Sequence, residues 1–186
     1  MPITHEIHCC SAGIHPWHLT EENAEKQWQW LISEVRKPGV VAIGECGLDK
    51  LKGGPMPIQL QMFERCAELA EERELPLIIH AVKSTEELLH IKKKIKPQVP
   101  WIIHGFRGRR EVAQQYLKHG FYLSFGEHFQ EEALCCVPLD KLLLETDESN
   151  LPIRAIYQKV ADTYGITMTL LTESITSNVK KVLFLR

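Results

Sequence analysis

Short apolar runs alternate with longer amphipathic stretches along this chain. Six runs combine β-branched, aromatic and other apolar residues: CSAGIH (10–15), VVAIGE (40–45), LPLIIH (75–80), WIIHGF (101–106), FYLSFG (121–126) and KLLLETD (141–147). Strands that are apolar on both faces are typical of parallel sheets that helices cover. The alternation therefore predicts an α/β fold in which six parallel strands are joined by helices.

The stretches between the runs have helical periodicity. One face of residues 21–36 carries Ala24, Trp28, Leu31, Ile32 and Val35, and one face of residues 58–73 carries Leu60, Phe63, Ala67 and Ala70. Thr20 and Ser84 each precede an acidic first turn and are predicted to be helix N-caps. The lysines at 92–94, near the end of the helix that Ser84 opens, either complement the helix dipole or form a solvated face.

Residues that can bind a metal stand where the apolar runs end. They are His15, Glu45, His80, His104 and Asp147, with Asp49 and Glu145 close by. One such histidine is more often a hydrogen-bonded structural residue, and one such aspartate is often a helix N-cap. Five such residues, one at each of five strand ends, meet at one rim if the sheet curls into a barrel. Imidazole and carboxylate groups are ligands for zinc, manganese or magnesium, so the pattern predicts a curled sheet with a divalent metal site.

Composition narrows the class of protein. The 186 residues suit one domain, expected to span 1–186, and 44% of them are hydrophobic. The net charge of −2 is unlike that of proteins that bind nucleic acid through bulk positive charge, so any such contact must be local. No apolar run is long enough for a membrane span, and the N-terminus lacks a signal-peptide pattern. Six cysteines without a CxxC motif favour reduced thiols and a cytoplasmic location.

Several motifs, in order, resemble the TatD family of metal-dependent deoxyribonucleases. They are GIHPWHL (13–19), AIGECGLD (42–49), LPLIIH (75–80), IIHGFRG (102–108), YLSFG (122–126), LLLETD (142–147) and SITSNVKKVLF (174–184). The resemblance covers about Ser11 to Arg186. It implies a TIM-barrel fold of the amidohydrolase superfamily and hydrolysis of DNA or another phosphodiester with one or two divalent metals.

The resemblance also implies roles for individual residues. Glu45 would be the carboxylate shared between metals, and His80 and His104 would bind the second metal. Asp147 would bind the first metal or act as the base that takes a proton from the attacking water, so Glu45 and Asp147 are the expected catalytic carboxylates. His15 would contact the substrate, although a structural turn residue before Pro16 is an equal alternative.

Basic residues near these positions are candidate phosphate contacts. Arg107 and Arg109 follow His104, and Lys83 follows His80. Arginine suits bidentate phosphate binding, and lysine acts as a point charge. The family more often has arginine at the position of Lys83. The alternative is a solubilising loop, and Arg110 is expected to face solvent at the start of a helix.

The chain departs from the family pattern before residue 15. The family begins with a strand that ends in HxH, about fifty residues before GIHP, and these histidines hold the first metal. Here His5 and His8 are three apart, which on a strand places them on opposite faces, and the pairing of His8 with Cys10 is a weak substitute. We therefore expect an incomplete barrel with six to seven parallel strands and at most one well-occupied metal.

Three explanations of the missing segment stay open: an opening covered by N-terminal residues or by a second copy, a start site chosen too late, or a diverged relative with one metal. The exposed sheet edge would make a homo-oligomer possible.

Three functions fit the sequence. The first is a metal-dependent phosphodiesterase of the deoxyribonuclease type, which Arg107 and Arg109 favour. The second is another amidohydrolase-type hydrolase. The third is a catalytically impaired remnant that acts as a binding module, which the missing HxH favours and the retained metal-binding residues disfavour.

Overall fold

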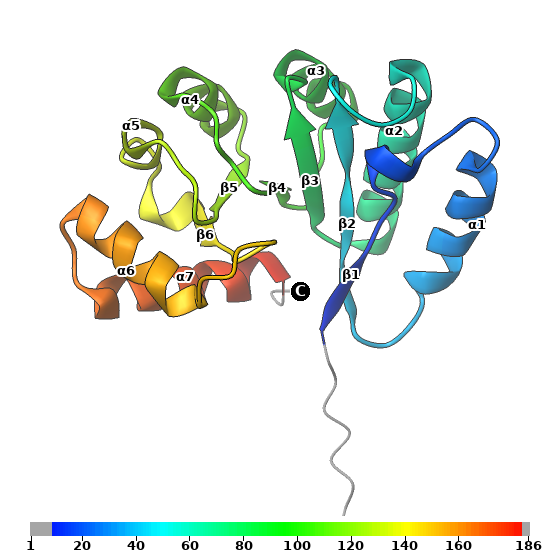
Figure 1. Ribbon diagram of the computed structural model, residues 1–186. Helices are drawn as coiled ribbons and strands as arrows, with labels where there is room; N and C mark the ends of the chain where they lie inside the picture. The colour runs from blue at the N-terminus through cyan, green and yellow to red at the C-terminus, as the bar shows by residue number, and fades with distance from the viewer. Residues whose placement is uncertain (1–8, 184–186) are drawn as a thin grey trace, which may run out of the picture.

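The computed structural model describes residues 9–183 and contains a curled sheet of six parallel strands (Figure 1). The strands follow one another in chain order across the sheet: β1 (Cys10–Ala12), β2 (Val40–Asp49), β3 (Leu77–Val82), β4 (Trp101–Ile103), β5 (Tyr122–Phe125) and β6 (Leu142–Leu144). Every neighbouring pair is parallel. The predicted fold class, an incomplete barrel of the TIM type, is confirmed.

Helices connect the strands, and most of them cover the outer face of the sheet. They are η1 (Pro16–His18), α1 (Ala24–Glu34), α2 (Met56–Arg73), α3 (Thr85–Ile95), α4 (Arg110–Lys118), α5 (Glu131–Leu134), η2 (Leu139–Lys141), α6 (Ile153–Tyr164) and α7 (Met168–Leu183). Side chains alternate between the two faces of a strand. Accordingly, Trp101 and Ile103 of β4 lie in the large hydrophobic core with residues of α2 and α4, whereas Ile102 faces the concave side.

The end of the last helix covers part of the concave face. Val182 of α7 is buried against Ile102, Tyr122 and Leu143, the inward-facing residues of β4, β5 and β6. In a closed TIM barrel, side chains from the strands themselves fill this space. Here the end of a helix supplies part of this packing.

Strands β2 and β3 are longer than the sequence pattern predicts. Strand β2 continues beyond Glu45 to Asp49, and β3 continues beyond His80 to Val82, because the two strands stay paired with Gly47 opposite His80. Glu45 and His80 therefore lie within strands, which corrects their expected position at strand ends.

The sequence also has histidines near its N-terminus and predicts no membrane span. His5 and His8 lie outside the described residues. Within residues 9–183, no helix is long and apolar enough to cross a membrane.

Candidate metal centre

One carboxylate oxygen lies at the centre of a cluster of imidazoles on the concave side of the sheet. Oε1 of Glu45 is 3.2 Å from Nδ1 of His80, 3.2 Å from Nε2 of His104 and 3.4 Å from Nε2 of His15. His80 belongs to β3, whereas His15 and His104 follow β1 and β4. The curl of the sheet therefore brings together four of the residues that the sequence analysis selected.

Two glycines let Glu45 reach this position. Gly44 and Gly47 flank the Glu45–Cys46 pair and have φ angles of +145° and +153°. A Cβ at Gly44 would lie 2.6 Å from the carbonyl oxygen of Ile78, and one at Gly47 would lie 2.0 Å from that of His80. Only glycine allows β2 to approach β3 this closely, so the Gly-Glu-Cys-Gly sequence is what places the carboxylate.

Asp49 fixes the orientation of His80. Its Oδ2 is 3.0 Å from Nε2 of His80 and accepts a hydrogen bond of 2.7 Å from Nε1 of Trp17. Its Oδ1 accepts from the backbone N–H groups of Leu51 and Lys52, at 2.8 and 3.0 Å. A carboxylate beside Nε2 favours the proton on that nitrogen, so the lone pair of Nδ1 faces Glu45.

Glu145 has the same relation to His104, through the opposite nitrogen. Its Oε1 lies 2.8 Å from Nδ1 of His104, and its other oxygen accepts a hydrogen bond from the hydroxyl of Ser124. Oε1 is buried and has no well-aligned hydrogen bond within the described residues. Its contact with the His104 imidazole therefore offsets the cost of burying this oxygen. The proton is thereby favoured on Nδ1, and Nε2 faces Glu45 and, at 3.9 Å, Oδ2 of Asp147.

His15 is arranged as a donor. The backbone N–H of Trp17 donates to Nδ1 of His15, at 3.2 Å. A neutral imidazole that accepts at Nδ1 carries its proton on Nε2, the nitrogen that faces Glu45. An imidazole nitrogen must be unprotonated to bind a metal. His15 therefore offers a hydrogen-bond donor to the site, whereas His80 and His104 offer lone pairs.

Burial and neighbouring charges shift the pKa values of the groups in the cluster in different directions. Burial opposes ionisation of His104, but Glu145, Glu45 and Asp147 outweigh it and raise its pKa to about 9. Burial likewise opposes charge on His80, and Glu45 and Asp49 raise its pKa. The pKa of Glu45 is lowered because its histidine partners outweigh its burial, and the pKa of His15 is lowered chiefly by burial.

The potential ligands fall into two groups. His15, Glu45 and His80 form one, and His104, Glu145 and Asp147 form the other; within each, the possible ligand atoms lie within 4.8 Å of one another. Imidazole and carboxylate donors in this number suit a divalent cation such as zinc or manganese.

A cleft of about 590 Å³ opens over the cluster. Lys83, Arg107 and Asp147 line it. Lys83 and Asp147 have φ angles of +52° and +47°, and the two other non-glycine residues with positive φ in the described chain end helices. Left-handed backbone in non-glycine residues is common at functional sites, where surrounding structure holds it in place.

Arg109 lies apart from this cleft. It is the N-cap residue of α4 and is exposed. It lines neither the 590 Å³ cleft nor the cavity of about 450 Å³ that shares Arg107 and Asp147 with this cleft. Arg110 is the first residue of α4 and is exposed, as expected.

Sequence reasoning did not give roles to Asp49, Glu145, Ser124 and Trp17. Asp49 and Glu145 stood beside the selected residues, but their contacts with imidazoles depend on the curl of the sheet. Ser124 had one available signal, since a polar residue interrupts the apolar FYLSF run on the inward-facing parity.

Comparison with known proteins assigns the chain to a family. The family model described as TatD related DNase matches residues 4–184. The chain belongs to the TatD-related DNase family. The resemblance inferred from the TatD-like motifs is therefore confirmed.

Two TatD-family relatives illustrate the sequence similarity. The chain is 31% identical to the uncharacterized metal-dependent hydrolase YabD of Bacillus subtilis, covering 89% of this chain and 74% of that protein. It is 30% identical to the 3'-5' ssDNA/RNA exonuclease TatD of Citrobacter koseri, covering 82% of this chain and 63% of that protein. The chain thus spans less than two thirds of the length of the Citrobacter TatD protein.

A solved TatD-family structure has the same fold. The crystal structure of YJJV, a TatD homolog from Escherichia coli K12, matches 96% of this chain with a TM-score of 0.81 at 20% sequence identity. The match covers 77% of that chain.

Proposed function

We propose that this protein hydrolyses phosphodiester bonds of nucleic acid with a divalent metal bound at Glu45. The observation that carries the proposal is the position of one Glu45 oxygen within 3.4 Å of the imidazoles of His15, His80 and His104. A carboxylate oxygen that faces Nδ1 of His80 and Nε2 of His104 is suited to a cation that replaces the protons of those two nitrogens.

The proposed ligands are Glu45, Nδ1 of His80, Nε2 of His104 and Asp147. Each ligating nitrogen is the one left free by an outer carboxylate, Asp49 for His80 and Glu145 for His104. His15 is excluded from this set because its Nδ1 accepts the N–H of Trp17. The set takes Glu45 and His80 from one group of potential ligands and His104 and Asp147 from the other. We propose that they hold one metal between them, and zinc, manganese and magnesium are the candidates.

The remaining residues of the cleft bind and orient the substrate. When bound, the metal would lower the pKa of a water molecule and polarise the phosphoryl oxygen. Nε2–H of His15 donates to a phosphate oxygen, and Lys83 and Arg107 supply positive charge from the cleft wall. Asp147 acts as the general base that takes the proton of the attacking water.

The substrate class follows from the relatives and the cleft together. The Citrobacter TatD protein bears the name of a 3'-5' exonuclease of single-stranded DNA and RNA. A cleft with Lys83 and Arg107 beside the candidate metal ligands suits the same phosphodiester chemistry. The cytoplasmic location and a homo-oligomer stay predictions.

Cleavage of single-stranded DNA tests the proposal. The purified protein, loaded with manganese, should degrade a short single-stranded oligonucleotide, and Glu45→Ala or His104→Ala should lower the rate by more than about 100-fold, because each removes a ligand. Elemental analysis of the same preparations should give close to one metal in the parent and far less in both variants.

Glu173→Gln and His90→Ala are the matched controls. Both residues are exposed, on α7 and α3, away from the cleft, and both variants should cleave like the parent. Cleavage that persists in Glu45→Ala would assign the activity to a contaminant or to another site. Less than about a tenth of an equivalent of metal in the loaded parent would contradict the metal site.

A further inference from the structure

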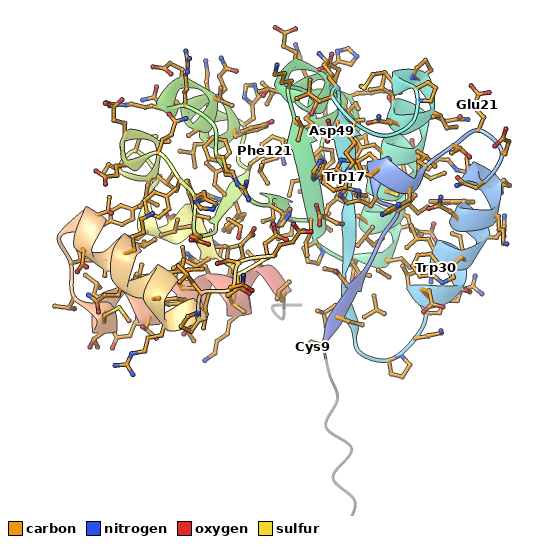
Figure 2. The ribbon with its side chains drawn as sticks, in the orientation of Figure 1. Cys9, Trp17, Glu21, Trp30, Asp49 and Phe121 are labelled. Carbon is orange, nitrogen blue, oxygen red and sulfur yellow. The ribbon has the colours of Figure 1, made fainter. Side chains whose placement is uncertain are left out.

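Trp17 is a fixed aromatic side chain on the wall of the cleft. It lines the same 590 Å³ cleft as Glu45, Lys83 and Arg107, and 38% of its surface is exposed. Figure 2 labels it beside Asp49, near the end of β2. Trp101, by contrast, is fully buried in the core.

Polar contacts hold the Trp17 ring in place from two sides. Its Nε1 donates to Asp49 at 2.7 Å, and its backbone N–H donates to His15. The rings of His15 and His80 meet it edge-on, with centroids 4.9 and 5.4 Å away. A ring that is already ordered loses little conformational entropy when a ligand stacks on it.

Glycine packing fixes the backbone beneath the ring. Gly53 has a φ of +101°, and a Cβ there would lie 2.4 Å from the carbonyl oxygen of Pro16 and 3.2 Å from Cα of Trp17. The loop after β2 therefore supports the Pro16–Trp17 turn directly.

Positive charge lies on and beside the ring. Nζ of Lys52 is 3.4 Å from the centroid of the Trp17 ring, and Lys83 and Arg107 line the same cleft. An aromatic face beside cationic side chains is the arrangement that binds single-stranded nucleic acid, because bases stack on the ring and phosphates pair with the cations.

We propose that Trp17 is a stacking platform for one base of a single-stranded nucleic acid. The base would displace the Lys52 ammonium that lies over the ring, and Lys52 would then pair with the phosphate of that nucleotide. The subsite rests on the proposed hydrolysis of nucleic acid and names how its substrate is held. It predicts that recognition of the base, as distinct from the phosphate backbone, depends on this ring.

Binding measurements with and without bases test the platform. Fluorescence anisotropy would compare a labelled oligothymidylate with an abasic oligonucleotide of equal length, in chelator so that neither is cleaved. The parent should prefer the oligothymidylate. Trp17→Ala should weaken oligothymidylate binding by about fivefold to hundredfold and leave abasic binding within about twofold.

Two further variants separate stacking from structural support. Trp17→Phe loses the hydrogen bond to Asp49 but retains an aromatic face, so it should keep most of the preference for bases. Trp30→Ala is the matched control, because Trp30 is 47% exposed but lies on α1, away from the cleft (Figure 2), and it should bind like the parent.

The outcomes decide between the platform and its alternatives. Equal weakening of both oligonucleotides in Trp17→Ala would mean that Trp17 acts only by supporting Asp49 and His80, and would overturn the platform. A parent without a preference for bases would overturn it as well. If the manganese-loaded parent cleaves DNA but shows no preference for bases, only the platform is refuted. If the preference depends on Trp17 but no cleavage is seen, only the proposed hydrolysis is refuted.

Discussion

At the scale of single residues, two outer carboxylates determine what the two proposed histidine ligands can do. Asp49 occupies one nitrogen of His80, and Glu145 occupies one nitrogen of His104. In metal sites, such outer partners fix the tautomer and orientation of a histidine ligand and increase its basicity. Asp49 and Glu145 are therefore expected to matter nearly as much as the ligands themselves.

Asp49→Asn should lower metal affinity. An asparagine has only one side-chain oxygen, so either Trp17 and His80 or the N–H groups of Leu51 and Lys52 would face an amide NH₂ group. The expected loss is about 10- to 100-fold in the dissociation constant for manganese or zinc, measured by calorimetric titration. Asp162→Asn, an exposed change on α6, should leave the constant unchanged, and an unaltered affinity in Asp49→Asn would refute the orienting role.

The stability of the metal-free protein should fall as pH rises, because of His104. Its pKa is raised from 6.5 to about 9 in the folded state, so the charged form stabilises the fold fully below pH 6.5, and this contribution is lost as pH rises through 9. We expect the free energy of unfolding to fall by about 1–3 kcal/mol across this window.

Denaturant titrations in chelator would measure this loss in the parent and in His104→Gln, where it should be smaller. Lys92 acts in the opposite sense above pH 8, because burial lowers its pKa to about 8. The difference between the parent and His104→Gln cancels this effect of Lys92. If the free energy of unfolding changes with pH in the same way in both proteins, His104 is not the source of the pH dependence.

At the scale of elements, α7 has a second role besides packing beside the sheet. Its last turns place Val182 among inward-facing residues of three strands, where a closed barrel has only strand side chains. The end of the helix thereby packs against β4 and β6, the strands that precede His104 and Glu145.

Val182→Ala should destabilise the fold by about 1–3 kcal/mol, because it leaves a cavity beside Ile102, Tyr122 and Leu143. Leu170→Ala on the same helix is the matched control, since Leu170 is 45% exposed and should cost little. Chemical denaturation of both variants gives the comparison, and equal effects would contradict a packing role specific to the end of α7.

The number, direction and order of the strands could be predicted from the alternation of apolar runs, but several boundaries could not. Helix α1 begins at Ala24, with Asn23 as its N-cap, because Thr20 and Asn23 exchange hydrogen bonds in the preceding turn. Ser84 is the N-cap of α3, yet its hydroxyl donates to the carbonyl of Leu48 in β2. The Thr20–Asn23 contact is local, whereas the Ser84 hydroxyl bonds to a strand 36 residues away, which local propensity does not include.

The lysine run shows a similar limit. Of the two interpretations of residues 92–94, a solvated face describes Lys93 and Lys94, which are exposed. Lys92 instead lies over the rings of Trp101 and Phe121, with Nζ 4.8 and 4.4 Å from their centroids. Trp101 and Phe121 both lie beyond the end of α3 at Ile95, so the helix sequence alone could not predict the contact.

For the candidate site, the convergence of Glu45, His80 and His104 could be predicted, because parallel strands that curl bring one end of each together. The donor role of His15 and the position of Arg109 could not. The first depends on a backbone N–H in the turn at Trp17, and the second on where α4 begins.

At the scale of the whole molecule, the proposed metal site joins strands from both sides of the sheet. Glu45 belongs to β2 and Asp147 follows β6, and β1 and β6 are the outer strands of the described sheet. A ligand bound only by the folded state stabilises it in proportion to the logarithm of its concentration.

Manganese at about 100 times its dissociation constant should stabilise the protein by about 3 kcal/mol. For a chain of this size, that raises Tm by roughly 5–10 °C. Thermal unfolding followed by circular dichroism would measure the shift, which a chelator should reverse and Glu45→Ala should abolish. A shift of the same size in Glu45→Ala would mean that manganese binds elsewhere.

The distribution of these ligands along the chain has a consequence for quality control. Residues 45 and 147 are about a hundred positions apart, and they meet only when every strand between them has paired and the sheet has curled. A partly folded or cleaved chain therefore lacks the complete ligand set even where each local motif is intact. Metal uptake then reports that the entire sheet has assembled, and an incomplete molecule would carry no competent hydrolytic centre.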